Sequence, residues 1–221
     1  MQHWLFDIRS RTFFLLLVSF LILTYLAYAK IISPLDSTIE NYVHSLGGNM
    51  AVDLAMQIFT EMGWILYLVF FSFILLIKKD TRRVGLVLLL SIIIGSMISA
   101  YLRCYIGYEA PTLKFVGSHL TLISAPDIGV PCKIDGSFPA GHTVRTTIFA
   151  FIVGFALSKR FPRGCYLLWI YPILVSISRV YLMQQFTMDL VGGALLGVII
   201  ANIASKILKL DLIFVSQKPN S

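Results

Sequence analysis

Five ionisable side chains stand in or beside long apolar runs, where together they could bind or transfer an anionic group. They are Arg103, His142, Arg145, Arg179 and Asp189. Charged groups are costly inside a membrane, so those that occur there usually pair with one another or act on a substrate. Guanidinium groups match phosphate oxygens, and a histidine near a carboxylate suits proton transfer or nucleophilic attack. Between Arg179 and Asp189, however, stand two amides that do not titrate, Gln184 and Gln185.

The composition of the chain indicates an integral membrane protein. Of its 221 residues, 57% are hydrophobic and 13% are charged, and the mean hydropathy is +0.83. Soluble proteins are about 45–50% apolar and about 25% charged. The length fits a single domain over residues 1–221. The three cysteines make neither a disulfide scaffold nor a metal motif.

Six apolar stretches are long enough to cross a bilayer, which takes about 20 residues per helix. We therefore expect an all-α, polytopic bundle of six transmembrane helices. The predicted spans are 13–32, 60–77, 84–106, 142–158, 165–183 and 188–208.

The segments between the spans predict how the chain is oriented. Basic residues collect on the cytoplasmic side of short loops. The N-terminus, the loops "KKDTRR" and "KRFPRG" and the C-terminal tail are all basic, and six crossings place them on one side. Residues 33–62 fall on the other side and hold four acidic residues without Lys or Arg. We expect the protein to lie in the cell membrane, with both termini in the cytoplasm. The net charge of +7 follows from this topology, so no nucleic acid partner is needed.

Two segments on the external side have a character of their own. Residues 33–46, "SPLDSTIENYVHSL", start with a proline and carry apolar residues at helical spacing, which predicts an amphipathic outer helix after the first span. Residues 107–140 contain several prolines and glycines and predict a long external loop. Loops of this length are often functional.

This topology brings the ionisable residues to one depth, at the external ends of the spans. Arg103 lies at the end of the third span, and His142 and Arg145 open the fourth. Arg179 lies near the end of the fifth span, and Asp189 opens the sixth. We expect their side chains to converge on an external site.

Three blocks of sequence hold these residues: "RCYIGYEAP" at 103–111, "GSFPAGHT" at 136–143 and "SRVYLMQQFTMD" at 178–189. In order and spacing they resemble the signature blocks of the type 2 phosphatidic acid phosphatase superfamily, which also includes vanadium haloperoxidases. Those blocks read K-x6-R-P, P-S-G-H and S-R-x5-H-x3-D. The layout of spans is similar to that of the lipid phosphatases in this superfamily, over nearly the whole chain. The third block is the most specific match, at Ser178, Arg179, Asp189 and Gly193.

The resemblance implies a phosphate site that uses no metal and no other cofactor. Its substrate would be a membrane lipid phosphate or an isoprenoid diphosphate that enters from the bilayer. Arg103, Arg179 and the backbone amide of Gly141 would hold the phosphate. In the family, a third-block histidine attacks phosphorus with help from the carboxylate at the position of Asp189, and the histidine at the position of His142 protonates the leaving oxygen.

Arg103 stands where the family has lysine, which preserves the charge, whereas three other positions lose a functional group of the family pattern. Ala110 replaces an arginine, Ala140 replaces the serine of P-S-G-H, and Gln185 stands where the nucleophilic histidine should be. A glutamine amide cannot attack phosphorus, although it exchanges hydrogen bonds, so Asp189 could hold it in place. Arg145 lies three residues after His142, on a similar helix face, and could replace the charge lost at Ala110.

A different group could take over the chemistry. His119 in the long loop or His44 in the first external segment could fold over the site. His142 could instead serve as a base for an attacking water.

Simpler interpretations exist for several of these residues. Arg103 and Arg179 could extend to the membrane surface, His142 could cap a helix, and Asp189 could be a carboxylate favoured by a helix dipole. Cys104 and Cys132 both fall on the external side and could form a disulfide. Cys165 falls on the opposite side and is expected to be free.

Two functions of different classes remain. The first is an enzyme, a phosphohydrolase or phosphotransferase acting on a lipid phosphate. The second is a catalytically silent relative that binds a lipid phosphate or serves as a structural membrane protein. The three departures favour reduced or lost phosphatase activity. Haloperoxidase activity comes third, because those relatives are typically soluble and nothing in the sequence indicates peroxide chemistry.

Overall fold

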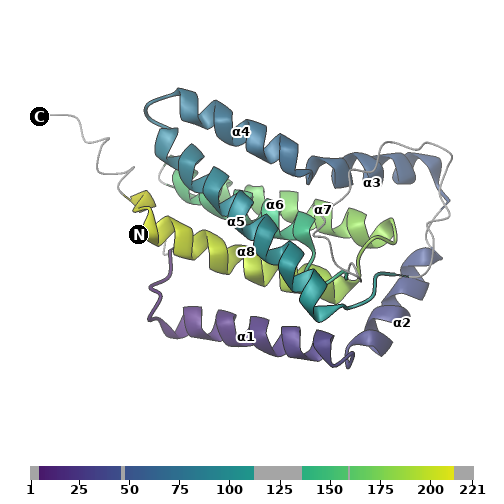
Figure 1. Cartoon of the computed structure of the whole chain (residues 1–221). Helices are drawn as coiled ribbons and strands as arrows, with labels where there is room; N and C mark the ends of the chain where they lie inside the picture. The colour runs from purple at the N-terminus through teal and green to yellow at the C-terminus, as the bar shows by residue number, and fades with distance from the viewer. Residues whose placement is uncertain (1–4, 46–47, 112–135, 159, 212–221) are drawn as a thin grey trace, which may run out of the picture.

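The computed structural model describes residues 5–45, 48–111, 136–158 and 160–211, and within these ranges the secondary structure is helical, without strands. Figure 1 shows the helices as a bundle with two shorter helices, α2 and α3, toward one end. The elements are α1 (Arg11–Tyr28), α2 (Ser33–His44), α3 (Met50–Met62), α4 (Ile65–Ile77), α5 (Arg82–Ile106), α6 (Gly141–Leu157), the 3-10 helix η1 (Gly164–Trp169), α7 (Ile170–Tyr181) and α8 (Thr187–Ile207).

Local sequence signals fix where several helices begin and end. The side chain of Ser10 accepts a hydrogen bond from the backbone N–H of Phe13 at the start of α1, and Asn49 caps α3 in the same way. Helix α5 ends at Gly107, which has a left-handed conformation with φ 59° and donates its N–H to the carbonyl of Arg103. That conformation strongly favours glycine.

Helix α6 forms the centre of the bundle. Thirteen of its 17 residues are buried, and it packs against α5, α7 and α8. Glycines permit the close approach: a Cβ placed on Gly197 of α8 would lie 2.8 Å from the carbonyl oxygen of Val144 in α6. Small residues at helix contacts are typical of membrane bundles.

The described helices only partly match the six predicted spans. Four elements are long and apolar enough to cross a membrane: α1, α5, η1 with α7, and α8. Counting α3 and α4 as one bent span makes five. Helix α6 is apolar but has only 17 residues. The count of six spans therefore stays a prediction.

The second predicted span, 60–77, differs from the structure in its shape. Helices α3 and α4 meet at an angle of 52°, with a break at Gly63 and Trp64. The backbone of Trp64 is extended, with ψ 138°, so the helical hydrogen bonds cannot continue through it. Helix α3 therefore departs from the direction of α4 at this break (Figure 1).

The ends of the helices define the two ends of the bundle. Helices α5 and α7 finish, and helices α6 and α8 begin, at the end that we call the site end. Helix α2 lies at this end and contacts α7 and α8, whereas α1 starts and α8 finishes at the opposite end (Figure 1).

The predicted amphipathic outer helix is present as α2, but its two fully buried residues are acidic. Asp36 and Glu40 are buried, whereas Leu35 and Tyr42 are exposed. The part of the bundle that α2 covers offers hydrogen-bond donors, so α2 turns its carboxylates inward.

Candidate functional site

Four ionisable residues from four helices lie at the site end. Arg103 is in the last turn of α5, His142 in the first turn of α6, Arg179 in the last turn of α7 and Asp189 in the first turn of α8. Their exposed fractions are 4%, 1%, 6% and 0%. The two arginines therefore point into the protein. They do not extend to the membrane surface, as the simpler interpretation of the sequence would have it.

Backbone hydrogen bonds connect the three sequence blocks that carry these residues. The N–H of Ser137, in the second block, donates to the carbonyl of Tyr108, in the first, at 2.7 Å. The N–H of Ala140 donates to the carbonyl of Asp189, in the third block, at 3.0 Å. The blocks are far apart in the sequence, and these two bonds hold them in one place.

Close packing around glycines reinforces the same connections. A Cβ on Gly136 would lie 2.6 Å from the carbonyl oxygen of Arg103, and a Cβ on Gly193 would lie 2.7 Å from that of Ala140. Cβ atoms essentially never come this close to another atom. Only glycine therefore lets the backbone segments of the site approach one another so closely.

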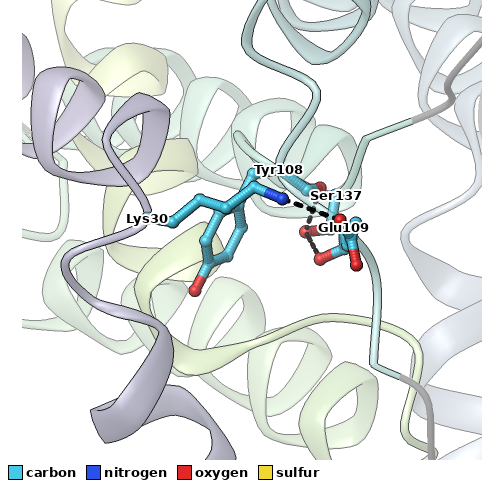
Figure 2. A network of polar contacts seen from close by, with 4 residues as sticks. All are labelled: Lys30, Tyr108, Glu109 and Ser137. Atoms are coloured by element: carbon cyan, nitrogen blue, oxygen red, sulfur yellow. Dashed lines mark hydrogen bonds and ion pairs between the residues drawn. The ribbon is translucent and has the colours of Figure 1, made fainter.

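A network of side chains and carbonyl groups holds the loop after α5, as Figure 2 shows. The hydroxyl of Ser137 donates to the carbonyls of Tyr108 and Glu109, each at 3.1 Å. Lys30, just after α1, forms an exposed ion pair with Glu109 at 2.7 Å. The hydrogen bond and charge of Lys30 lower the pKa of Glu109. The loop is thus attached both to the second block and to the end of α1.

The Asp189 carboxylate has two different oxygens. Oδ2 accepts the backbone N–H of Phe186 at 2.8 Å and so caps α8. Oδ1 is buried and accepts no hydrogen bond of ordinary geometry, although the Ser137 hydroxyl lies nearby. Arg103 lies close enough for its charge to act on Asp189.

Gln185 is 5% exposed, and its Oε1 is buried without a hydrogen-bond partner in the part of the chain that the structure describes. The sequence left open that Asp189 could hold this amide, and the described residues show no hydrogen bond between the two side chains.

The junction of α3 and α4 packs against His142 and Arg145. A Cβ on Gly63 would lie 2.8 Å from Cδ2 of His142. The bend in this span leaves carbonyl groups without helical partners. Tyr171 donates to the carbonyl of Met62 at 2.6 Å, and Nε of Arg145 donates to that of Gly63 at 3.3 Å. Arg145 thus lies at this junction. Ala110, which stands where the family has an arginine that Arg145 could replace, is exposed.

The outer helices contribute buried carboxylates that the sequence analysis treated only as evidence for topology. Asp36 of α2 is 1% exposed and accepts the hydroxyl of Tyr108 at 2.8 Å and the backbone N–H of Met188 at 3.2 Å. Asp53 of α3 accepts the hydroxyl of Tyr181 at 2.7 Å. Burial raises the pKa of Asp36, and it also raises the pKa of Tyr108.

These contacts place α2 against the start of α8, beside Asp189. Their sequence signal was weak, because a carboxylate on a predicted amphipathic helix usually faces water. The spacing of Asp36 and Glu40, one turn apart on the same face, was the available hint.

The other sequence candidates lie as follows. His44 is half-buried at the end of α2, and His119 lies outside the described residues. Cys104 takes part in a disulfide, Cys132 lies outside the described residues, and Cys165 is free and buried as expected. Within the described ranges, no group of three His, Cys, Asp or Glu side chains could hold a metal ion.

Comparison with known proteins identifies the fold and the family. Residues 84–211 match the model of the PAP2 superfamily. The crystal structure of a transmembrane PAP2-type phosphatidylglycerolphosphate phosphatase from Bacillus subtilis superposes with a TM-score of 0.70 at 20% sequence identity, over 93% of this chain and 97% of that one. That likeness establishes the fold.

A protein from Sulfolobus acidocaldarius named undecaprenyl-diphosphatase is 30% identical to this chain over 125 residues. The match covers 56% of this chain and 55% of the Sulfolobus protein, so it spans about half the length of that relative. Together with its apolar helices, these matches show that the chain is an integral membrane protein and that it belongs to the PAP2 superfamily.

Proposed function

We propose that this member of the PAP2 superfamily binds the phosphate or diphosphate head of a membrane lipid at the site end, and that its phosphatase activity through a phospho-histidine is reduced or lost. The observation that carries the proposal is the buried amide of Gln185 among Arg103, His142, Arg179 and Asp189. The surroundings suit a phosphate, whereas the residue at the nucleophile's position cannot form a phospho-enzyme.

Binding is supported by the charge and the backbone geometry of the site. Arg103 and Arg179 are buried on two different helices, and guanidinium groups bind phosphate oxygens through paired hydrogen bonds. Helix α6 begins at Gly141, next to His142, so its first N–H groups face the same end. Helix N-termini favour anions.

Reduced turnover is supported by three side chains. Gln185 has no nitrogen lone pair with which to attack phosphorus. Ala140, 0% exposed, supplies no hydroxyl. Ala110 is exposed and supplies no charge.

The relatives suggest two classes of ligand. One is named for an undecaprenyl diphosphate and the other for phosphatidylglycerolphosphate. Both molecules join a phosphorylated head to long hydrocarbon chains. We propose a ligand with these features, held at the external ends of six spans, with both termini in the cytoplasm.

A second candidate function is hydrolysis without a phospho-enzyme. Asp189 Oδ1 and Gln185 Oε1 are both buried acceptors; among the described residues, Gln185 Oε1 has no hydrogen-bond partner and Asp189 Oδ1 has only the Ser137 hydroxyl nearby. Such acceptors commonly bind water, and a water held there could attack phosphorus with His142 as base or acid. This mechanism would give phosphate release that depends on His142.

The test measures phosphate release and phosphate binding by the purified protein in lipid nanodiscs. The substrates are phosphatidate, phosphatidylglycerol phosphate and a polyprenyl diphosphate. Each is given to the native chain and to the variants Gln185→His and His142→Ala. We expect the native chain to stay at background and Gln185→His to release phosphate. If the native chain releases phosphate and His142→Ala does not, the proposal of lost activity is wrong, and hydrolysis without a phospho-enzyme is favoured.

Vanadate binding by calorimetry tests the site separately. We expect the native chain to bind vanadate, Arg179→Met to bind it much more weakly, and Arg163→Met to behave as native. Arg163 is the control because it is exposed and lies just before η1, on the opposite side of the bundle from the end of α7. Equal binding by the two variants would show that Arg179 does not hold the anion.

A further inference from the structure

A groove of about 500 Å³ runs along α7 and α8 beneath α2. Its walls are almost wholly apolar: Ile177 and Val180 come from α7, Leu190 and Ala194 from α8, and Ile39 and Val43 from α2. Pockets that hold small molecules typically measure about 300–1,000 Å³. The groove is therefore large enough for an extended hydrocarbon segment.

One end of the groove lies beside the candidate phosphate site, because the same ends of α6, α7 and α8 contribute to both. Thr143 and Leu190, which line it, directly follow His142 and Asp189 in the chain. Tyr181, another lining residue, comes two residues after Arg179. None of Arg103, His142, Arg179 and Asp189 lines the groove. An apolar groove beside a basic site nevertheless complements a lipid with an anionic head and a hydrocarbon tail.

Two of the hydroxyl groups along the groove bond to each other. Thr143 Oγ1 and Ser176 Oγ form a hydrogen bond of 3.0 Å with each other, so they need no polar ligand. An occupant of this part of the groove is accordingly apolar.

Helix α2 forms part of one wall of the groove and is hydrogen-bonded to segments that carry the site. Ile39 and Val43 line the groove and stand three and seven residues after Asp36, on one helix face. Asp36 binds the hydroxyl of Tyr108 and the backbone N–H of Met188. Helix α2 is therefore fixed to the segments that carry the phosphate site.

The length of the groove suits a lipid chain. Its lining residues on η1 and α7 extend from Trp169 to Tyr181, which corresponds to about 18 Å at the helical rise. The hydrocarbon core of a bilayer is about 30 Å thick. A chain whose head is at the site end would therefore follow α7 for about half that depth.

We infer that this groove holds the hydrocarbon chain of the lipid whose phosphate occupies the site. The inference rests on the proposed function for the head, and it adds where the tail lies: between α7 and α8, beneath α2. Any bulk lipid could touch the outer surface of the bundle, but only a lipid anchored by its phosphate would be selected in the groove.

Photo-crosslinking tests this selection directly. The photoreactive residue p-benzoylphenylalanine replaces Ile177, which lines the groove and is 49% exposed, or Met97 of α5, which is 51% exposed and does not line it. Each protein is placed in nanodiscs with labelled polyprenyl phosphate or labelled polyprenol. We expect position 177 to capture the phosphate severalfold more than the alcohol, and position 97 to capture both equally.

A second substitution tests whether the preference for the phosphate depends on the groove or only on the nearness of position 177 to the site. Ala194→Phe, added to the protein with the crosslinker at position 177, places a large ring in the groove and should remove the preference for the phosphate. Retention of the preference in that variant would overturn the inference. Equal capture of phosphate and alcohol at position 177, or capture there of a protein instead of a lipid, would also overturn it.

Vanadate binding by the native chain shows which proposal has failed. If vanadate binds but position 177 shows no preference, the groove is not the tail site while the proposed function stands. If vanadate does not bind and the preference is also absent, both are wrong.

Discussion

The substitution Gly193→Ala tests whether close packing between α6 and α8 shapes the site. Gly193 lies one turn after Asp189 in α8, and a Cβ there would be 2.7 Å from the carbonyl oxygen of Ala140 and 3.1 Å from Cβ of Thr143. A side chain could rotate away from the new methyl group, but a carbonyl in the backbone cannot. The same residue, Ala140, donates its N–H to the carbonyl of Asp189. The start of α6, which carries His142, must therefore move away from α8.

The structure sets the size of the effect. The carbonyl must retreat by about 0.7 Å to reach 3.4 Å, where ordinary contact begins. Overpacking of this kind costs about 1–3 kcal/mol, and the better helix propensity of alanine returns about 1 kcal/mol. We expect the free energy of unfolding to fall by roughly 1 kcal/mol, the middle of that difference.

The effect on ligand binding should be larger than the effect on stability. Moving His142 relative to Asp189 would weaken at least one hydrogen bond to a bound phosphate, and hydrogen bonds to charged groups contribute about 1.5–3 kcal/mol. Since about 1.4 kcal/mol is a factor of ten in affinity, vanadate should bind at least tenfold more weakly.

Denaturant unfolding in detergent and calorimetric vanadate titration measure the two effects. The control is Gly164→Ala, because a Cβ on Gly164 would meet only Cβ of Phe161, at 3.6 Å. If Gly193→Ala binds vanadate as tightly as Gly164→Ala and is equally stable, the backbone contact does not shape the site.

Three further predictions concern the surroundings of the site. Tyr108→Phe should lower the free energy of unfolding by about 1.5–3 kcal/mol in denaturant titrations, because the buried carboxylate of Asp36 loses a donor; unchanged stability would contradict the contact. Burial raises the pKa of Asp36 above its usual 3.8, so the folded state holds this proton more tightly than the unfolded chain. Thermal unfolding should therefore show the native chain losing stability relative to Asp36→Asn as pH rises from 3.8 through the raised pKa, and the opposite slope would refute this cause. Arg145→Met should weaken vanadate binding in calorimetry if Arg145 replaces the charge missing at Ala110; native binding with lower stability would mean that Arg145 serves only the carbonyl of Gly63.

Apolar runs predicted most helix boundaries well. The third predicted span, 84–106, matches α5 (Arg82–Ile106), and the last, 188–208, matches α8 (Thr187–Ile207). Charged residues border both runs, and the cost of placing charge in lipid makes those boundaries sharp. The bend at Gly63 and Trp64 could not be predicted in this way, because it lies inside an apolar run.

The topology of the spans was enough to predict which residues lie at the same end of the bundle. Counting spans brought Arg103, His142, Arg179 and Asp189 to one end, and the structure places all four there as buried side chains. The contact of Asp36 with Tyr108 was not predicted, since it joins positions 72 residues apart and has no periodic signal. The inward turn of α2 is likewise decided by its partners, which its own sequence does not show.

The groove and the phosphate site would contribute differently to recognition. A hydrocarbon chain that leaves the bilayer for the groove exchanges one apolar surrounding for another, so it gains little free energy. Affinity and discrimination between lipids must then come mainly from the buried arginines and the helix N-terminus at the head. The groove would set the direction from which the head arrives, with α2 fixed over it by Asp36. On the proposed function, a protein built in this way would select a lipid phosphate without any chemical step, so a glutamine at position 185 would not by itself remove that function.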